Sequence, residues 1–178
     1  PGRESSAVYR TRAAPKPRTA ADVNALAVVL DEAERAHGVL EGHTRIIAIA
    51  TEVPASVLTM PTYLDASPRL EGITWGAEDL SALVGSNATR LADGWSWTSP
   101  YRLARDMTLM AAAATGRLPI DTVFANFRNI EGFKSECAEA VRDGFLAKMA
   151  IHPDQVPLIN EAFTPSAMEI AWDVSVET

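Results

Sequence analysis

Two carboxylate side chains, Glu52 and Asp79, follow short apolar runs of the kind that forms buried β-strands. They lie 27 residues apart, which is about the length of one strand–helix unit. In parallel sheets built from such units, the chemistry is done by side chains at the carboxyl ends of the strands and in the loops that follow. We therefore expect Glu52 and Asp79 at one rim of a sheet, on adjacent strands.

Carboxylates at such a rim suit a hard divalent cation such as Mg²⁺, which keeps part of its water shell, because no cysteine or histidine neighbours either residue. Paired carboxylates also perform general acid–base catalysis, and their spacing does not separate the two chemistries. A structural alternative is that Glu52 and Asp79 each cap the helix that follows. Glu78 is expected to face solvent or to support Asp79.

Other polar residues follow the later apolar runs. His152 ends one of these runs, where it either orients a ligand or is hydrogen-bonded to the backbone. Asn126 and Arg128, near the end of another run, are weaker candidates for ligand contact. Cys137 is the only cysteine, which excludes an internal disulfide and a cysteine-rich zinc site, and we expect it to be a packing residue.

The elements that must position these residues alternate between two hydrophobic periods, which is the signature of βα units and a parallel sheet. The predicted strands are residues 45–52, 70–75, 120–127 and 147–152, with a weaker strand pattern at 8–14. Thr19 is the expected N-cap of the first helix. The predicted helices are residues 20–37, 57–66, 100–115, 131–142 and 157–163.

Two of these helices have a clear apolar side. The residues expected to face the core are Val23, Leu26, Ala27, Leu30, Leu103, Met107, Met110 and Ala111. A long insert with Trp95 and Trp97 separates the strand at 70–75 from the helix at 100–115. It forms either a lid over a ligand or a surface excursion pinned by the two tryptophans.

Composition limits the class of protein. The 178 residues are 47% hydrophobic and 22% charged, so residues 1–178 are expected to form a single globular domain. No run approaches the roughly 18–20 apolar residues of a membrane helix, and no export signal is readable. The net charge of −7 argues against nucleic acid as a partner, and a basic cluster in residues 3–18 either binds phosphate or is solvated. We expect a cytoplasmic protein.

Several motifs, in this order and spacing, are similar to those of a known family. They are Thr51-Glu52, the run from Trp75 to Leu80, a segment at 85–105, and the runs 120–124, 131–133, 150–156 and 163–166. Together they resemble the HpcH/HpaI aldolase and citrate lyase beta-subunit family, in its CitE-like branch, over about residues 15–170. No single motif is specific, but the set is.

The resemblance implies a (β/α)₈ TIM barrel that uses Mg²⁺ to cleave or form a carbon–carbon bond beside a thioester. The substrates implied are 3-hydroxy-acyl-CoA compounds such as citryl-, malyl- or citramalyl-CoA, with an acyl-CoA and a 2-oxo acid as products. Glu52 and Asp79 match the family's metal-binding residues. Lys16 resembles the lysine that ends an earlier family strand, and Glu52, Lys16 and His152 form the substrate-binding set that we expect. The family also implies a homo-oligomer, a trimer or a hexamer.

The sequence departs from the family pattern at both ends. A full barrel takes about 250 residues, whereas this chain holds four or five βα units, so it corresponds to the C-terminal portion of a barrel. Residues 1–15 are difficult to assign, and residues 164–178 form a tail. The family's substrate-gripping arginine has no counterpart, Asn126 stands where many relatives have aspartate, and the proton-transfer group is unknown. Either the sequence belongs to a longer chain or another subunit completes the sheet.

Three functions therefore stay open. The leading one is a Mg²⁺-dependent acyl-CoA lyase, which the segments at 90–94 and 151–153 favour. The second is an aldolase that acts on free 2-oxo acids without coenzyme A. The third is a non-catalytic binding or assembly subunit that retains the metal site, for which the missing arginine is the best support.

Overall fold

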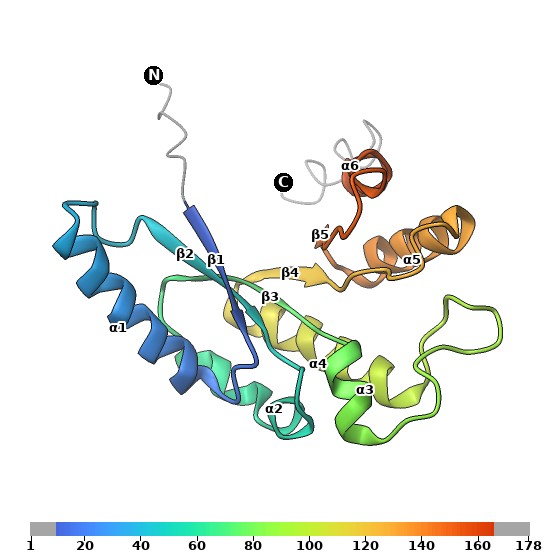
Figure 1. Ribbon diagram of the computed structural model, residues 1–178, viewed down its shortest axis with the longest axis horizontal. Coiled ribbons are helices and arrows are strands. Elements are labelled where there is room, and N and C mark those ends of the chain that lie inside the picture. The colour runs from blue at the N-terminus through green and yellow to red at the C-terminus, as the bar shows by residue number, and fades with distance from the viewer. Residues whose placement is uncertain (1–9, 166–178) are drawn as a thin grey trace, which may run out of the picture.

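The computed structural model describes residues 10–165, and they form one five-stranded sheet with helices between the strands (Figure 1). All neighbouring strands are parallel, and their order in space is their order in the chain. The strands are β1 Arg10–Pro15, β2 Thr44–Ile49, β3 Leu70–Thr74, β4 Leu118–Asp121 and β5 Ala147–Lys148. The weak strand pattern near the N-terminus is thus confirmed as β1, although residues 8 and 9 lie outside the described part.

Within residues 10–165, seven helical segments connect or follow these strands. They are α1 Ala20–Ala36, α2 Pro54–Leu58, the 3₁₀ helix η1 Met60–Asp65, α3 Glu78–Val84, α4 Ser99–Thr115, α5 Ile130–Asp143 and α6 Gln155–Phe163. The repeated strand–helix order gives consecutive parallel βα units, which form an arc of a (β/α)₈ barrel. In residues 10–165, no helix has both the length and the apolar character needed to cross a membrane.

Helix α1 begins where its sequence predicts. The Thr19 side chain accepts a hydrogen bond from the backbone of Ala21, and the Asp22 carboxylate accepts one from the backbone of Thr19, which makes a capping box. Val23 and Ala27 are buried, as expected, and Leu26 and Leu30 pack against the same core from its edge.

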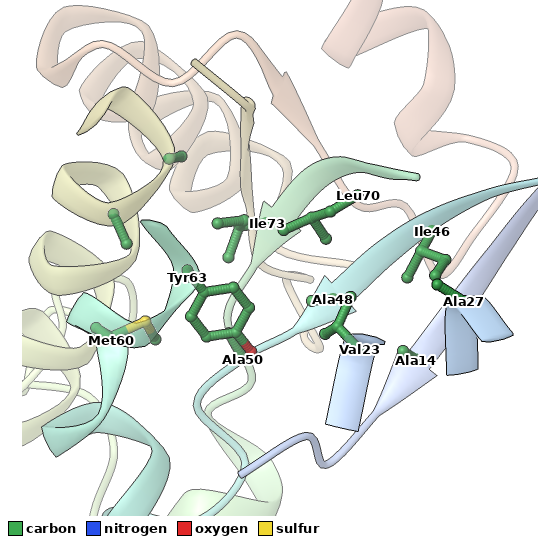
Figure 2. Packing of buried hydrophobic residues seen from close by; sticks show 12 residues of the cluster. Ala14, Val23, Ala27, Ile46, Ala48, Ala50, Met60, Tyr63, Leu70 and Ile73 are labelled. Carbon is green, nitrogen blue, oxygen red and sulfur yellow. The ribbon is translucent and has the colours of Figure 1, made fainter. Parts of the chain in front are cut away.

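The main core lies between the sheet and the helices of one face. Figure 2 shows Val23 and Ala27 of α1 close to Ile46 and Ala48 of β2, while η1 contributes Met60 and Tyr63. Because side chains alternate along a strand, Ile47 and Ile49 lie on the opposite face of β2, and both are only half-buried. The helices therefore cover one face of the sheet, and the other keeps apolar side chains partly open.

The insert between β3 and α4 is tied down by Trp97. Its indole packs edge-on against Trp75, with ring centroids 4.8 Å apart, and the guanidinium of Arg90 lies 3.6 Å from its ring centroid. Arg90 and Trp97 also form an isolated antiparallel bridge. Trp95 packs beside a separate cluster around Phe124. Both tryptophans thus anchor the insert, as the surface-excursion interpretation requires.

The strands are shorter than the apolar runs predict. The predicted strand 45–52 ends at Ile49, because the register pairs Ile49 with Pro15 and Thr74, the last residues of β1 and β3. The predicted strand 120–127 ends at Asp121, which leaves 122–129 as a connection. The predicted strand 147–152 is wrong beyond Lys148, since the Gln155 side chain accepts hydrogen bonds from the backbone of residues 151 and 152 and turns the chain.

Two expectations about helices are also wrong. The predicted helix 57–66 is two segments, α2 and η1, which meet at Thr59. In α4, Leu103 and Met110 point to solvent, and Met110 is 64% exposed. The physical reason is a one-residue rotation of the buried stripe, which consists of Tyr101, Ala104, Arg105, Thr108, Ala111 and Ala112. The expected tail after residue 165 lies outside the described residues.

Candidate metal centre

The two candidate metal ligands come together at the carboxyl ends of β2 and β3. Glu52 lies in the turn after β2 and is 8% exposed, while Asp79 lies in the first turn of α3 with half of its side chain exposed. Lys16 follows β1 directly and contacts both residues. Its backbone nitrogen donates to Glu52 Oε2 at 2.5 Å, and its Nζ lies 3.2 Å from Asp79 Oδ1. Neither carboxylate ends a strand as predicted, yet both reach the same rim.

Lys16 holds an uncommon backbone conformation to make the first of these contacts. Its φ is +54°, which makes it the only non-glycine residue with a positive φ in the part of the chain that is described. Residues other than glycine rarely adopt this left-handed conformation, and the following Pro17 restricts the backbone of Lys16 further. The hydrogen bond to Glu52 stabilises this conformation, so the end of β1 and the turn after β2 fix each other.

Gly76 leaves room for the Glu52 side chain. A Cβ atom at this position would lie 3.0 Å from Cγ of Glu52 and 3.3 Å from Cγ2 of Ile49. The backbone N–H of Gly76 donates a hydrogen bond to the Thr51 hydroxyl at 3.0 Å. The link between β3 and α3 is thus pinned to the turn that carries Glu52.

The two carboxyl groups lie close enough to perturb each other. Burial raises the pKa of Glu52 above its usual range, and the neighbouring Asp79 carboxylate raises it further, against the lowering effect of the Lys16 backbone N–H. The pKa of Asp79 is lowered by its hydrogen bond with Glu52 and by the Lys16 ammonium. Two acidic groups in this arrangement favour a bound cation.

A cavity of about 160 Å³ opens beside the pair. Glu52, Asp79, Glu78 and Thr74 line it, together with residues at the ends of β4 and β5. Thr74 is 1% exposed, and its buried hydroxyl has no hydrogen-bond partner among the described residues. A ligand in this cavity could supply the hydrogen bond that this buried hydroxyl lacks.

The donors in this cavity fit Mg²⁺. The carboxylates of Glu52 and Asp79 and the hydroxyl of Thr74 are hard oxygen ligands, and neither cysteine nor histidine lines the cavity. Within residues 10–165, no group of three or more histidine, cysteine, aspartate or glutamate side chains could hold a metal ion. An ion at Glu52 and Asp79 would therefore keep several waters, which is typical of Mg²⁺.

The structure does not bring His152 to this cavity. The His152 ring stacks on Phe127, with centroids 4.4 Å apart, and its Nδ1 lies 3.4 Å from Asp154 Oδ2. Arg128 also lies over Phe127, with its guanidinium carbon 4.8 Å from the ring centroid. Asn126 is exposed in the same connection. These three residues gather after β4 and β5, apart from Glu52 and Asp79. Cys137 is buried, as expected of a packing residue.

A buried ionic network behind the cavity escaped sequence reasoning. The Lys148 ammonium donates to Asp121 Oδ2 at 2.8 Å, to Glu136 Oε1 at 2.7 Å and to the Thr122 carbonyl. Trp75 Nε1 donates to the other oxygen of Asp121. Burial acts to raise the pKa of Asp121, but the Lys148 and Arg105 cations lower it overall. In the sequence, the signal for this network was one charged residue inside each of two apolar runs, Asp121 in the first and Lys148 in the second.

The comparisons with known proteins agree with this fold. The sequence model of the HpcH/HpaI aldolase/citrate lyase family matches residues 8–153. The chain belongs to this family.

Three relatives illustrate the likeness. The citrate lyase subunit beta-like protein of Mycobacterium tuberculosis is 34% identical over 171 residues, which are 93% of this chain and 62% of that protein. The L-malyl-CoA/beta-methylmalyl-CoA lyase of Cereibacter sphaeroides is 33% identical over 88% of this chain and 52% of its own. The crystal structure of protein CitE from Mycobacterium tuberculosis with magnesium, acetoacetate and coenzyme A matches at 33% identity with a TM-score of 0.75, over 94% of this chain and 56% of that one. The chain thus spans less than two thirds of the length of each.

Proposed function

We propose that the chain carries the metal centre of a Mg²⁺-dependent carbon–carbon lyase. Its substrates in this proposal are 3-hydroxy-acyl-CoA compounds such as citryl-, malyl- or citramalyl-CoA, which it cleaves to, or forms from, an acyl-CoA and a 2-oxo acid. The observation that carries the proposal is the meeting of Glu52 and Asp79 beside a cavity at the carboxyl ends of β2 and β3. Family membership and the malyl-CoA lyase relative support the choice of reaction.

Each residue of the rim has a defined task in this proposal. Glu52 and Asp79 hold the ion, which when bound supplies Lewis-acid stabilisation of the oxygen charge that changes during carbon–carbon cleavage. The Lys16 backbone N–H and the space at Gly76 keep the Glu52 carboxylate aimed at the cavity. The Lys16 ammonium is the nearby cation for the carboxylate of the 2-oxo acid. The Thr74 hydroxyl is available to a ligand in the cavity.

His152 stays in the proposal as a contact for a more distant part of the substrate. It follows β5 at its carboxyl end, and its side chain is partly exposed. Association into a trimer or hexamer and a cytoplasmic location also remain proposals. The latter rests on the acidic composition and the single cysteine.

Turnover of three thioesters tests the reaction. Citryl-, malyl- and citramalyl-CoA are incubated with the protein in Mg²⁺ or in EDTA, and the 2-oxo acid product is followed. We expect Mg²⁺-dependent release from one of the three, lost in Glu52→Gln and in Asp79→Asn. Glu71→Gln, which makes the same chemical change on the exposed side of β3, serves as the control and keeps activity.

The same assay separates the two other functions. Release from a free 2-oxo acid aldol adduct, and from none of the thioesters, would favour the aldolase without coenzyme A. Mg²⁺ binding without turnover on any of these compounds would favour a non-catalytic subunit and contradict the lyase proposal.

A further inference from the structure

Lys16 contacts both candidate metal ligands in different ways. Its backbone N–H is bonded to the buried Glu52, whereas its ammonium is paired with the half-exposed Asp79. The backbone contact is short and held by a constrained conformation between Pro15 and Pro17. The side-chain contact joins two groups that are 56% and 48% exposed, and such ion pairs are weak. The backbone of Lys16 is therefore fixed, while its ammonium group is free to move.

The position of the ammonium conflicts with a bound divalent cation. Lys16 Nζ lies 3.2 Å from Asp79 Oδ1, within the space that an ion on Asp79 would occupy. Two positive charges a few ångströms apart repel each other strongly in a half-buried cavity. The ammonium must therefore leave Asp79 when an ion binds there. A four-carbon stem with rotatable bonds makes that movement easy.

Resting on the proposed function, we propose that Lys16 is a metal-coupled positioning residue. Without a divalent ion, its ammonium neutralises Asp79. When the ion takes Asp79, the ammonium turns over the mouth of the cavity and binds the carboxylate of the 2-oxo acid. The metal and the organic anion thus bind in order, because the cation that holds the anion is released only after the ion has bound. This couples the two affinities through one side chain.

Chemical labelling of lysine measures the movement directly. The lysines of the sequence are Lys16, Lys134 and Lys148, of which Lys148 is buried and paired and Lys134 lies on α5 beside a different groove. Acetylation with an N-hydroxysuccinimide ester of acetate, read by peptide mass spectrometry, reports each amine separately. We expect Mg²⁺ to raise the labelling rate of Lys16 by about threefold, since it loses a weak ion pair. Oxaloacetate added with Mg²⁺ should lower it again, and Lys134 should not respond.

Binding measurements give the second readout. By calorimetry, Lys16→Met should bind Mg²⁺ about threefold more tightly than the parent, because the internal competitor is gone. With Mg²⁺ saturating, the same variant should bind oxaloacetate about tenfold more weakly, since a hydrogen bond to a charged group is lost. Lys16→Arg should retain oxaloacetate binding. The matched control Arg18→Met removes an exposed charge two residues away and should change the affinities for Mg²⁺ and for oxaloacetate by no more than about twofold.

The outcomes separate this inference from the proposed function. Mg²⁺ binding with unchanged Lys16 labelling would overturn the coupling while the metal site stands. Weaker Mg²⁺ binding by Lys16→Met would mean that Lys16 only supports Glu52 and Asp79, and would overturn it as well. Failure of the parent protein to bind Mg²⁺ would overturn the proposed function and this inference together.

Discussion

At the scale of single residues, the site depends on the space that Gly76 leaves. The carboxylate of Glu52 is buried against this glycine and held from the other side by the Lys16 backbone. Gly76 does not have a positive φ, so its role is close approach rather than backbone freedom.

Gly76→Ala is expected to weaken Mg²⁺ binding with little effect on folding. The new Cβ would meet Glu52 Cγ at 3.0 Å, and the flexible Glu52 stem would move away from it. We expect a several-fold weaker Mg²⁺ affinity in calorimetry and a loss of about 1 kcal/mol in the free energy of unfolding. An unchanged Mg²⁺ affinity would show that the position of Glu52 does not matter for the ion.

A second residue-scale prediction concerns Glu34, far from the site. Its carboxylate accepts hydrogen bonds from the backbone of Gly42 and Thr44 and is paired with Arg69. The Arg69 hydrogen bond is the main reason that the pKa of Glu34 is lowered to about 2, against the raising effect of burial. A depressed pKa in the folded state adds stability above the unfolded pKa of about 4.5, and this stability is lost as the pH falls toward 2.

Urea unfolding as a function of pH tests this sign. Glu34→Gln should be less stable than the parent at pH 7 by about 2–3 kcal/mol. The difference should shrink steadily between about pH 5 and pH 2, where the parent loses the charge of Glu34. Glu32→Gln, on the exposed side of α1, is the matched control and should follow the parent. A pH-independent difference would contradict the assignment.

At the scale of elements, β4, β5 and α5 are joined behind the cavity by charge. Lys148 on β5 is fully buried and contacts Asp121 on β4 and Glu136 on α5. The residues that follow β4 and β5, Thr122 and Met149, line the cavity. The network thus holds the far wall of the site in place.

Lys148→Met should therefore be strongly destabilising. It would leave the carboxylates of Asp121 and Glu136 buried with one cation fewer, at a cost of about 3–5 kcal/mol. Lys134→Met, on the exposed face of α5, makes the same change and should stay within about 0.5 kcal/mol of the parent. Urea unfolding of the two variants measures both values, and similar results for the two would contradict a structural role for the network.

The sequence predicts the elements better than their ends. Period and composition were enough to find α1, with its Thr19 cap, and the order of the strands, but helix α3 was not predicted. The end of β2 at Ile49 depends on pairing with Pro15 and Thr74, which are distant in the chain, so no local pattern reveals it. Asp121 and Lys148 were missed for the same reason, because each looks like an interruption of an apolar run until its partner is known.

The candidate site was predicted to a similar extent. Spacing placed Glu52 and Asp79 at one rim, and the structure brings them together there. Lys16 came only from the family resemblance, because its contacts depend on a left-handed turn that its sequence disfavours. His152 follows β5 at its carboxyl end, as expected, but its ring stacks on Phe127 and does not line the cavity.

At the scale of the whole molecule, the described sheet has open edges at β1 and β5 and a partly open apolar face. Exposed strand edges and apolar faces associate with other chains. We expect the 178-residue chain to form oligomers whose masses are multiples of 19.1 kDa in light scattering. A monodisperse monomer of that mass would contradict completion of the sheet by another subunit.

The proposed lyase chemistry requires that Glu52 and Asp79 together hold Mg²⁺. Isothermal titration calorimetry with Mg²⁺ alone tests this metal binding without any substrate. The titration is made on the parent chain, on Glu52→Gln, on Asp79→Asn and on the control Glu71→Gln. We expect one site in the parent and in Glu71→Gln, and an affinity at least about tenfold weaker in each of the other two, since each loses a charged oxygen ligand. Equal Mg²⁺ binding by all four proteins would contradict the claim.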